Sequence, residues 1–514
     1  MGLINNKKSS KKDGIKPAMV VVLNHKEDTV KVYPLGNGNT SFGRAESSDI
    51  RVNSSIVGRK HGMFIWQEEY HSYYYADLNS TNGTILNGVL LKSNNPNQGV
   101  DAFKLNNLDV ISVDSIKDNK SCSNAITMLF TNSFSLLDEW KTLDISWYNE
   151  VLIGRSSKNN IVLKDITVSR KHAIIKKQNG NWVIYDNNSS NGIFLNGEKI
   201  EDNAILQNND VIKITDTILV YFDNRLLYNT TKKSGEDIHI DIIEKTVHKE
   251  GTIMESKKIL SDIHLDIKNG EFVLILGGSG AGKTTLVNAI LGVDKANGTI
   301  MLGNQDLYKN FETLKHKIGF VPQHSSSHLR MNDYTQNVIE DSARIKLPKD
   351  ISNKELKNKV VEVMDTLGIT QYRHQKISKL SGGQQKRVSV AVEAVSNPYL
   401  FILDEPDSGL DATTGRELMK NLNALSKTNK TVMVISHSSN NAQDLFTKVL
   451  VLAKSTQDNA GHLAFYGSVK DACNFFMVEH LQDIIKKINP KEEGGDGLAD
   501  RYIDRFSKNR NNYI

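Results

Sequence analysis

Three short blocks in the first half of the chain occur twice, in the same order and at a nearly constant separation. The paired blocks are FGRAESSDIRV (42–52) with IGRSSKNNIVL (153–163), VGRKHGMF (57–64) with VSRKHAII (168–175), and NSTNGTILNG (79–88) with NSSNGIFLNG (188–197). Arg44 and Arg155 lie 111 residues apart, and Asn82 and Asn191 lie 109 apart. A period of roughly 100 residues is too long for a solenoid, so the pattern predicts two copies of one domain.

Each copy alternates short apolar runs with turns made of Asn, Gly, Ser and Asp. In the second copy, Trp182–Tyr185 and Val211–Ile214 are such runs, and the turn sequences NSSNG and NND lie beside them. Short strands separated by frequent turn residues are typical of an all-β sandwich. We therefore predict two sandwiches, over residues 19–116 and 124–224, after a basic and disordered tail at 1–18.

The pattern changes after the second copy. Residues 225–237, which contain the polar run NTTKKSGED at 229–237, predict a linker. Apolar strands then alternate with helices over 238–480, which predicts an α/β domain with a largely parallel sheet. One of its helices begins at a capping box formed by Ser352 and Glu355. The Gly-rich and charged residues 481–514 form a C-terminal extension.

Composition narrows the class of protein. The 514 residues are 39% hydrophobic, carry a formal net charge of +5 and include two cysteines without a C-x-x-C pair. The small charge gives no case for nucleic-acid binding, and the cysteines form no disulfide framework or zinc knuckle, so a reducing cytosol fits. No apolar run approaches the roughly 18–20 residues that cross a bilayer. If the protein works at a membrane, we expect another chain to supply the span.

A glycine-rich loop follows the apolar strand Phe272–Leu276 at once. Its residues are Gly277, Gly278, Ser279, Gly280, Ala281, Gly282, Lys283, Thr284 and Thr285, with the spacing G-x-x-x-x-G-K-T. Glycines let backbone N–H groups turn toward phosphate oxygens, and the helix that follows adds the positive end of its dipole. Lys283 is placed to reach the β- and γ-phosphates, and Thr284 to place its hydroxyl on Mg²⁺. The loop predicts a site for ATP and Mg²⁺.

A second apolar strand, Leu400–Leu403, ends in two carboxylates. Asp404 is placed to hold Mg²⁺. Glu405 is placed to polarise the water that attacks the phosphate. On its own such a strand end more often belongs to a solvated turn, so the phosphate loop carries this interpretation.

The sequence Leu380-Ser381-Gly382-Gly383-Gln384 resembles the signature of ABC ATPases. The resemblance extends from Ile238 to Tyr466 and includes further matching residues: Gln323 of the Q-loop, Asp411 of the D-loop and the switch histidine His437. It implies that Ser381 and Gly383, with Gln384 and Asp411, contact ATP held by a second copy of the chain. It also implies that Gln323 senses Mg²⁺ and that His437 acts in hydrolysis beside Glu405.

Within that family, SGGQQKRVSVAVEAVSNP and LDEPDSGLD most resemble the G-type, or white, exporters. This resemblance implies a six-helix membrane domain, either as a separate permease chain or as a part absent from this sequence. It places the chain in the cytoplasm, on the inner face of the cell membrane. The chain departs from the family at Val247 and His248, which stand where an aromatic side chain often stacks on adenine.

The repeated β domain resembles the forkhead-associated domain, a sandwich that binds phosphothreonine. In the second copy the resemblance is carried by Gly154-Arg155, Ser169-Arg170-Lys171-His172 and Ser190-Asn191-Gly192. A phosphate dianion requires a guanidinium and hydroxyl or N–H donors that converge from loops. The resemblance assigns the phosphate to Arg155, Ser169 and Ser190, added charge to Arg170, the peptide backbone to Asn191 and a bracing role to His172. It implies a phosphothreonine protein and a Ser/Thr kinase as partners.

The first copy keeps Arg44, His61, Thr81 and Asn82 but has Gly58 where the second has Ser169. Losing a hydroxyl that faces a charged oxygen costs about 1–3 kcal/mol. We therefore expect the first copy to bind phosphopeptide poorly or to serve as a plain interaction domain.

The sequence as a whole predicts two all-β sandwiches of forkhead-associated type followed by an α/β P-loop NTPase of ABC type with a helical subdomain. We expect an ATP-hydrolysing transporter subunit of exporter type, regulated by phosphothreonine and paired with a permease and a second copy of itself. The alternative is a phosphothreonine-gated ABC ATPase scaffold without transport activity. The transported substrate is not readable from this sequence.

Overall fold

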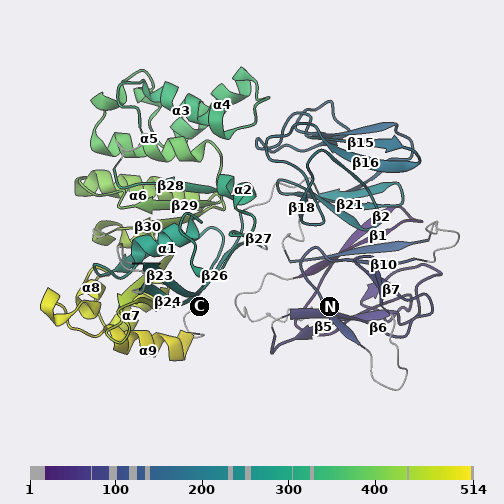
Figure 1. The fold of residues 1–514 in the computed structure, drawn as a ribbon, viewed down its shortest axis with the longest axis horizontal. Helices are drawn as coiled ribbons and strands as arrows, with labels where there is room; N and C mark the ends of the chain where they lie inside the picture. The colour runs from purple at the N-terminus through teal and green to yellow at the C-terminus, as the bar shows by residue number, and fades with distance from the viewer. Residues whose placement is uncertain are drawn as a thin grey trace, which may run out of the picture. The chain divides into compact units, whose positions relative to one another are not determined.

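The computed structural model describes residues 18–70, 72–91, 101–114, 124–132, 139–229, 235–248, 256–303, 305–324, 329–436 and 439–510. The chain divides into two compact units, Met1–Lys233 and Ser234–Ile514. The first unit is built from β-sheets stacked in four layers, and the second combines one large sheet with helices (Figure 1). The predicted fold class, two β-sandwiches followed by an α/β ATPase domain, is confirmed.

The first sandwich packs a six-stranded sheet against a five-stranded sheet. The six-stranded sheet has the order β2 (Thr29–Pro34), β1 (Met19–Asn24), β11 (Ile126–Thr131), β10 (Val110–Val113), β7 (Thr84–Leu86), β8 (Val89–Leu91). The five-stranded sheet has the order β4 (Ile50–Arg51), β3 (Thr40–Gly43), β5 (Gly62–Gln67), β6 (Ser72–Asp77), β9 (Ala102–Lys104). Phe42, Phe64 and Tyr75 lie fully buried in the core between the sheets.

The second sandwich repeats this arrangement. Its six-stranded sheet has the order β12 (Trp140–Asp144), β22 (Arg225–Asn229), β21 (Thr217–Phe222), β20 (Asp210–Ile214), β17 (Phe194–Leu195), β18 (Glu198–Lys199). Its five-stranded sheet has the order β14 (Ile161–Val162), β13 (Glu150–Gly154), β15 (Ala173–Gln178), β16 (Asn181–Asp186), β19 (Asn203–Ile205). Ile153, Ile175 and Trp182 lie in its core.

The two sandwiches pack back to back through their six-stranded sheets (Figure 1). Val21 of β1, Val220 of β21 and Leu227 of β22 belong to one apolar cluster shared by both copies. Every residue of β1 is buried, because one face lies in its own core and the other lies against the second copy. The tandem therefore buries apolar side chains on both faces of these sheets, which opposes independent movement of the copies.

The structure corrects two of the predicted domain boundaries. The second sandwich does not begin at 124, because β11 pairs with β1 and β10 in the first sandwich. The linker does not begin at 225, because β22 pairs with β12 and β21. Both boundaries are set by strand pairing with segments distant in sequence, and the turn residues near each boundary do not indicate that pairing.

The corresponding position in the two six-stranded sheets is occupied by strands from opposite ends of the two copies. The strand between β2 and β11 is β1, the first strand of its copy, whereas the strand between β12 and β21 is β22, the last of its copy. Both pair antiparallel with both neighbours. The second sandwich is therefore closed by the strand that leads into the ATPase unit.

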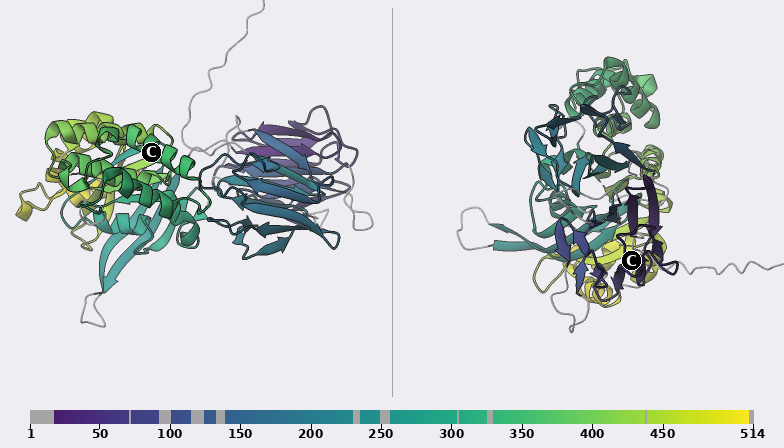
Figure 2. Two further views of the ribbon diagram at one scale, coloured as in Figure 1. Left: turned by 90° about the horizontal axis from the view of Figure 1, so that it is seen from above. Right: turned by 90° about the vertical axis from the view of Figure 1, so that its right-hand side faces the viewer.

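The ATPase unit is built on a ten-stranded sheet. Its order is β27 (Gln305–Asp306), β26 (Asn297–Leu302), β23 (Ile238–His248), β24 (Ser256–Ile267), β32 (Gly461–Gly467), β31 (Lys448–Lys454), β25 (Phe272–Gly277), β30 (Thr431–Ile435), β29 (Leu400–Asp404), β28 (Ile318–Val321). The strands from β31 to β28 run parallel, as predicted. β23, β24 and β26 form an antiparallel arm, and the long β23–β24 hairpin extends from it (Figure 2, teal).

Some helices of the ATPase unit pack on the sheet, and others pack mainly on one another. They are α1 (Lys283–Ile290), α2 (Phe311–Leu314), α3 (Thr335–Lys346), α4 (Asn353–Thr366), α5 (Gly382–Ala394), α6 (Ala412–Ser426), α7 (Val469–Phe476), α8 (Asp483–Ile488) and α9 (Ala499–Asn509). The helices α3, α4 and α5 pack together as the predicted helical subdomain (Figure 1). The predicted capping box is confirmed: Ser352 and Glu355 each accept from the other's backbone N–H at the start of α4.

The C-terminal extension belongs to the ATPase unit. Helix α9 packs on β32 and β31, with Tyr502 and Phe506 buried. The side chain of Asn489, at the end of α8, occupies the space that a side chain at Gly278 would need. The segment after residue 480 thus supports the phosphate loop. Within the described ranges, every helix is too short or too polar to cross a bilayer.

Candidate nucleotide and phosphopeptide sites

The glycine-rich loop connects β25 to α1. β25 is buried along its whole length between β31 and β30, so the start of the loop is fixed by the sheet. Gly282 precedes α1 with a φ of 86°, a left-handed conformation that glycine adopts readily. Ser279 and Gly280 at the tip of the loop are exposed. The backbone of the loop is therefore shaped and accessible as phosphate binding requires.

Lys283 and the two carboxylates at the end of β29 lie in one electrostatic neighbourhood. The ammonium of Lys283 donates to the carbonyl oxygens of Gly277 (2.8 Å) and Gly278 (3.0 Å). Burial lowers the pKa of Lys283, while Glu405 and Asp404 act to raise it. Only β30 separates β25 from β29 and all three are parallel, so their carboxyl ends meet at one edge of the sheet.

Gln323 and Glu405 are in direct contact although they lie 82 residues apart. The side-chain amide of Gln323 donates to Glu405 Oε2 at 2.8 Å. Glu405 has a φ of 41°, and its N–H donates to Ile435 O at 2.9 Å. Thr284 is exposed beside this edge. Hydroxyl, carboxylate and amide oxygens are the ligands that Mg²⁺ prefers, so Thr284, Asp404 and Gln323 fit a magnesium ion.

The signature residues form the N-terminus of α5. Ser381 Oγ accepts from the N–H of Gln384 (3.4 Å), and the Gln384 side chain accepts from the N–H of Ser381 (2.9 Å). Gly383 lies against Thr414 of α6, with no room for a side chain. Asp411 caps α6 by accepting from the N–H groups of Thr413 and Thr414. The structure therefore brings these four predicted residues to two neighbouring helix N-termini.

One buried residue at this site belongs to none of the short nucleotide-site motifs. Lys386 of α5 is 5% exposed, and its ammonium donates to the carbonyl oxygens of Pro322 and Gln323. In sequence it is one more polar residue of a helix that follows SGGQ. Its sequence position, two residues before Val388, does not distinguish it from an exposed lysine.

One predicted residue cannot be placed, whereas the two residues at the expected adenine position lie at the end of a strand. His437 lies outside the described residues; the preceding Ser436 donates to Asp407 Oδ2 at 2.6 Å. Val247 and His248 end β23 where the described part of that hairpin stops.

The phosphopeptide residues of the second sandwich lie on three loops that are joined to one another. The backbone N–H of Arg155 donates to Ser169 O, and its Nε donates to Val168 O, each at 3.0 Å. Ser169 Oγ accepts from the N–H of Ser190 at 3.2 Å. Ser190 and Arg170 are exposed, whereas Ser169 is buried. The structure thus brings all of these predicted residues to one end of the sandwich.

His172 and Asn191 brace these loops. His172 is fully buried; Nδ1 accepts from the N–H of Ser169 (3.1 Å) and Nε2 donates to Gly192 O (3.1 Å). Because a backbone carbonyl can only accept, this pattern describes a neutral ring protonated at Nε2. The Asn191 amide donates to Thr167 O at 2.8 Å, so it also fixes the loop from within the chain.

The first sandwich has the same brace. The N–H of Gly58 donates to His61 Nδ1 at 3.0 Å, and the amide of Asn82 donates to Ile56 O at 2.7 Å. The N–H of Arg44 donates to Gly58 O at 2.9 Å, as Arg155 does to Ser169 O. The first sandwich differs in the missing hydroxyl at Gly58, in the exposure of the Arg44 side chain, and in His61 Nε2, which lies 3.7 Å from Asp77 Oδ2.

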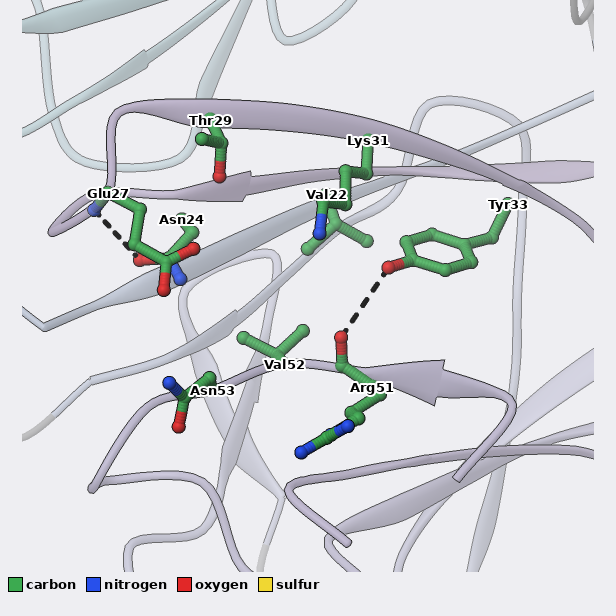
Figure 3. Close-up of a pocket in the computed structure, with 9 residues that line it drawn as sticks. All are labelled: Val22, Asn24, Glu27, Thr29, Lys31, Tyr33, Arg51, Val52 and Asn53. Atoms are coloured by element: carbon green, nitrogen blue, oxygen red, sulfur yellow. Dashed lines mark hydrogen bonds between the residues drawn. The ribbon is translucent and has the colours of Figure 1, made fainter. Parts of the chain in front are cut away.

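The first sandwich also carries a pocket of about 220 Å³ that no sequence pattern indicated (Figure 3). It is lined by Val22, Asn24, Glu27, Thr29, Lys31, Tyr33, Arg51, Val52 and Asn53. The Tyr33 hydroxyl donates to Arg51 O at 3.5 Å across it. Arg44, Gly58 and Asn82 do not line it, so it is separate from the loops that correspond to the phosphopeptide site.

Comparison with protein families matches both parts of the chain. The model described as "ABC transporter" matches residues 260–408. The model described as "FHA domain" matches residues 40–112 and again 151–215. The two forkhead-associated domains and the ABC ATPase domain inferred from the sequence are confirmed.

Three relatives illustrate the extent of the similarity. The ABC transporter ATP-binding/permease protein Rv1747 of Mycobacterium tuberculosis is 33% identical over 69% of this chain and 39% of its own length. ABC transporter G family member 22 of Arabidopsis thaliana is 31% identical over 49% of this chain and 33% of its own. The manganese transport system ATP-binding protein MntB of Bacillus subtilis is 34% identical over 48% of this chain and 90% of its own.

The chain thus spans 39% and 33% of the first two relatives and, in its C-terminal half, matches nearly the full length of the third. These matches agree with the phosphate loop, the paired carboxylates and the signature helix of the second unit. They identify the second unit as an ABC ATPase domain. The chain belongs to the ATP-binding proteins of ABC transporters, carries their ATPase domain, and has two FHA domains in front of it.

Proposed function

We propose that this chain is the ATP-hydrolysing subunit of an exporter-type ABC transporter and that its second FHA domain regulates it by binding phosphothreonine. The observation that carries the first part is the meeting of Lys283, Gln323 and Glu405 at one edge of the sheet. Similarity to G family members supports the exporter type.

The residues of the nucleotide site have three roles in hydrolysis: binding phosphate, binding Mg²⁺ and activating water. The N–H groups of the loop from Gly277 to Thr285 and the Lys283 ammonium bind the phosphates of ATP. Thr284, Asp404 and Gln323 hold Mg²⁺, which neutralises phosphate charge when it is bound. Glu405 orients and polarises the attacking water, and His437 assists it.

A second copy of the chain completes each site. Ser381, Gly383 and Gln384 lie at the start of α5, where Ser381 is exposed and Gly383 is buried, and the helix dipole favours a phosphate at that end. Asp411 lies at the adjacent start of α6. ATP thus joins two copies into a homodimer, and its hydrolysis separates them. We propose that this cycle drives a membrane permease, at the inner face of the cell membrane.

The second FHA domain supplies the control. Arg155, Ser169, Ser190 and Arg170 bind the phosphate of a phosphothreonine that a Ser/Thr kinase has modified, and Asn191 holds the loop beside it. β22 ends at Asn229 and β23 begins at Ile238, so the segment between this domain and the ATPase unit is short. Thr230 and Thr231, which lie outside the described residues, are candidate phosphorylation sites within it.

Replacing Glu405 tests hydrolysis. We expect Glu405→Gln to keep ATP binding and to lose about 10²–10⁴-fold in turnover, the usual contribution of a general base. Lys283→Ala is the matched contrast, because it weakens nucleotide binding itself. Light scattering of Glu405→Gln with MgATP then measures dimer formation. Hydrolysis at the wild-type rate by Glu405→Gln would remove Glu405 from this role.

A scaffold without transport would satisfy the same ATPase measurements. Affinity capture from membranes separates the two functions, because a transporter subunit brings down a permease with six membrane spans. Capture of a kinase and its substrates, with no permease, would favour the scaffold.

A further inference from the structure

Lys386 is a buried cation in a helix that otherwise packs through apolar and small side chains. It lies on α5, five residues after the N-cap Ser381, and is 5% exposed. Burying an ammonium is costly unless its donors are satisfied. Here the ammonium donates to Pro322 O at 3.1 Å and, more closely, to Gln323 O. The side chain therefore ties the signature helix to the backbone of the Q-loop.

The residue that Lys386 holds is itself in contact with the proposed base. The side-chain amide of Gln323 donates to Glu405 Oε2 at 2.8 Å. Three elements distant in sequence are thus joined in series: α5 through Lys386, the Q-loop through Gln323, and the end of β29 through Glu405. Each connection is a hydrogen bond, and of the three side chains Lys386 and Glu405 carry charge.

The electrostatic surroundings fit a cation at this position. Burial lowers the pKa of Lys386, and Asp404, Asp407 and Glu405 act to raise it. Asp404 ends β29, Glu405 and Asp407 follow it, and Asp407 also accepts from Ser436 after β30. An uncharged side chain would leave two carbonyl oxygens without their donor and would remove one of the two ammonium groups, Lys283 and Lys386, that act on Asp404 and Glu405.

We propose that Lys386 is a positioning residue for ATP hydrolysis, holding the Q-loop so that Gln323 sets the orientation of Glu405. When Ser381 at the start of the same helix engages the nucleotide of a second copy, the displacement of α5 reaches Glu405 through this connection. The inference rests on the proposed roles of Glu405 and of the second copy.

The first experiment compares Lys386→Met with Lys386→Arg and with Lys357→Met in the full chain. Lys357 is an exposed lysine on α4, so its replacement removes the same side chain from a solvated face. We expect Lys386→Met to lose about 10- to 100-fold in kcat, as for a lost hydrogen bond from a charged group. The affinity for ATP changes less than threefold, and Lys386→Arg recovers part of the loss. Lys357→Met keeps wild-type kcat.

A double-mutant cycle separates positioning from general support of the fold. If Lys386 acts through Gln323, the double variant Lys386→Met with Gln323→Ala hydrolyses ATP no more slowly than Gln323→Ala alone. A role in folding alone predicts multiplied losses in the cycle, and that result would overturn the proposal. If Lys386→Met unfolds, Lys386→Gln, which retains a donor, takes its place in the same cycle.

The outcomes also separate this inference from the proposed function. If Glu405→Gln loses turnover while Lys386→Met and Lys386→Gln hydrolyse at the wild-type rate, the inference alone is wrong. If Glu405→Gln itself keeps full turnover, the proposed function of the site fails first.

Discussion

The two FHA domains share a frame and differ at the position that would meet a phosphate. His61 and His172 accept from the N–H of Gly58 and Ser169 in the same way, at 3.0 and 3.1 Å. Asn82 and Asn191 both fix the neighbouring loop. The residues that make the repeat recognisable are therefore largely those that shape the loops. Ligand binding depends on a smaller set, which one copy can lose while it keeps its fold.

The difference at Gly58 is chemical and leaves the loop geometry unchanged. A Cβ atom added to Gly58 would lie 3.5 Å or more from its neighbours, which is ordinary van der Waals contact. The first copy could therefore hold a serine without rearrangement. This makes the comparison testable in both directions.

The largest effect is expected from the arginines. Arg155→Ala removes a guanidinium from the proposed phosphate site, where each charge-assisted hydrogen bond contributes about 1.5–3 kcal/mol. We expect phosphothreonine peptide affinity to fall about 100-fold or more, because such a fork donates two bonds. Arg44→Ala in the first copy is the control and changes little. Calorimetry with phosphorylated and plain peptides measures both, and an equal loss in the two variants would erase the distinction between the copies.

The second effect tests the interface between the copies through pH. Burial, with a smaller contribution from Arg225, lowers the pKa of His25 to about 4, although Asp114 opposes the shift. His25 lies against Phe222 of the second copy, with ring centroids 4.5 Å apart. As pH falls from 7 toward 4, the unfolded chain binds a proton that the folded chain does not. The free energy of unfolding therefore decreases, by about 3 kcal/mol over this range.

His25→Gln removes this dependence and leaves the other titrating groups in place. All four tryptophans, Trp66, Trp140, Trp147 and Trp182, lie in the tandem unit, so their fluorescence follows its unfolding in the full chain. An identical pH dependence in the wild type and in His25→Gln would mean that His25 is not buried at a stable interface.

The third effect is an exchange of one residue between the copies. Ser169→Gly is expected to weaken phosphopeptide binding by about 1–3 kcal/mol, or 5- to 150-fold. Gly58→Ser is expected to strengthen binding at the first copy in a chain that carries Arg155→Ala. If Gly58→Ser adds no affinity, exposure of Arg44, rather than the missing hydroxyl, limits the first copy.

The same contrast shows what the sequence could predict. Elements with local signals were predicted well: the capping box of α4, the buried strand before the phosphate loop, and the apolar strand that begins at Leu400. The ends of the repeated domains were not, because β11 and β22 are defined by partners more than 80 residues away or on the far side of a hairpin. Turn residues nearby give no information on such pairing.

In the candidate sites as well, residues with a local sequence signal were predicted, and a residue that depends on distant contacts was not. Motif spacing indicated Lys283, Glu405 and Ser169, whose surroundings follow from a strand end or a loop. Lys386 carried no such signal, since its importance comes from carbonyl groups of a loop 63 residues earlier in the chain. A single lysine in a helix is usually exposed, and only packing distinguishes this one.

One measurement tests whether the second FHA domain controls the ATPase domain. ATP hydrolysis by the full chain is recorded with increasing amounts of a phosphothreonine peptide and of its unphosphorylated counterpart. We predict that only the phosphorylated peptide changes the rate, that Arg44→Ala keeps the response and that Arg155→Ala abolishes it. A rate that ignores the phosphorylated peptide, although calorimetry shows that the peptide binds, would contradict this prediction.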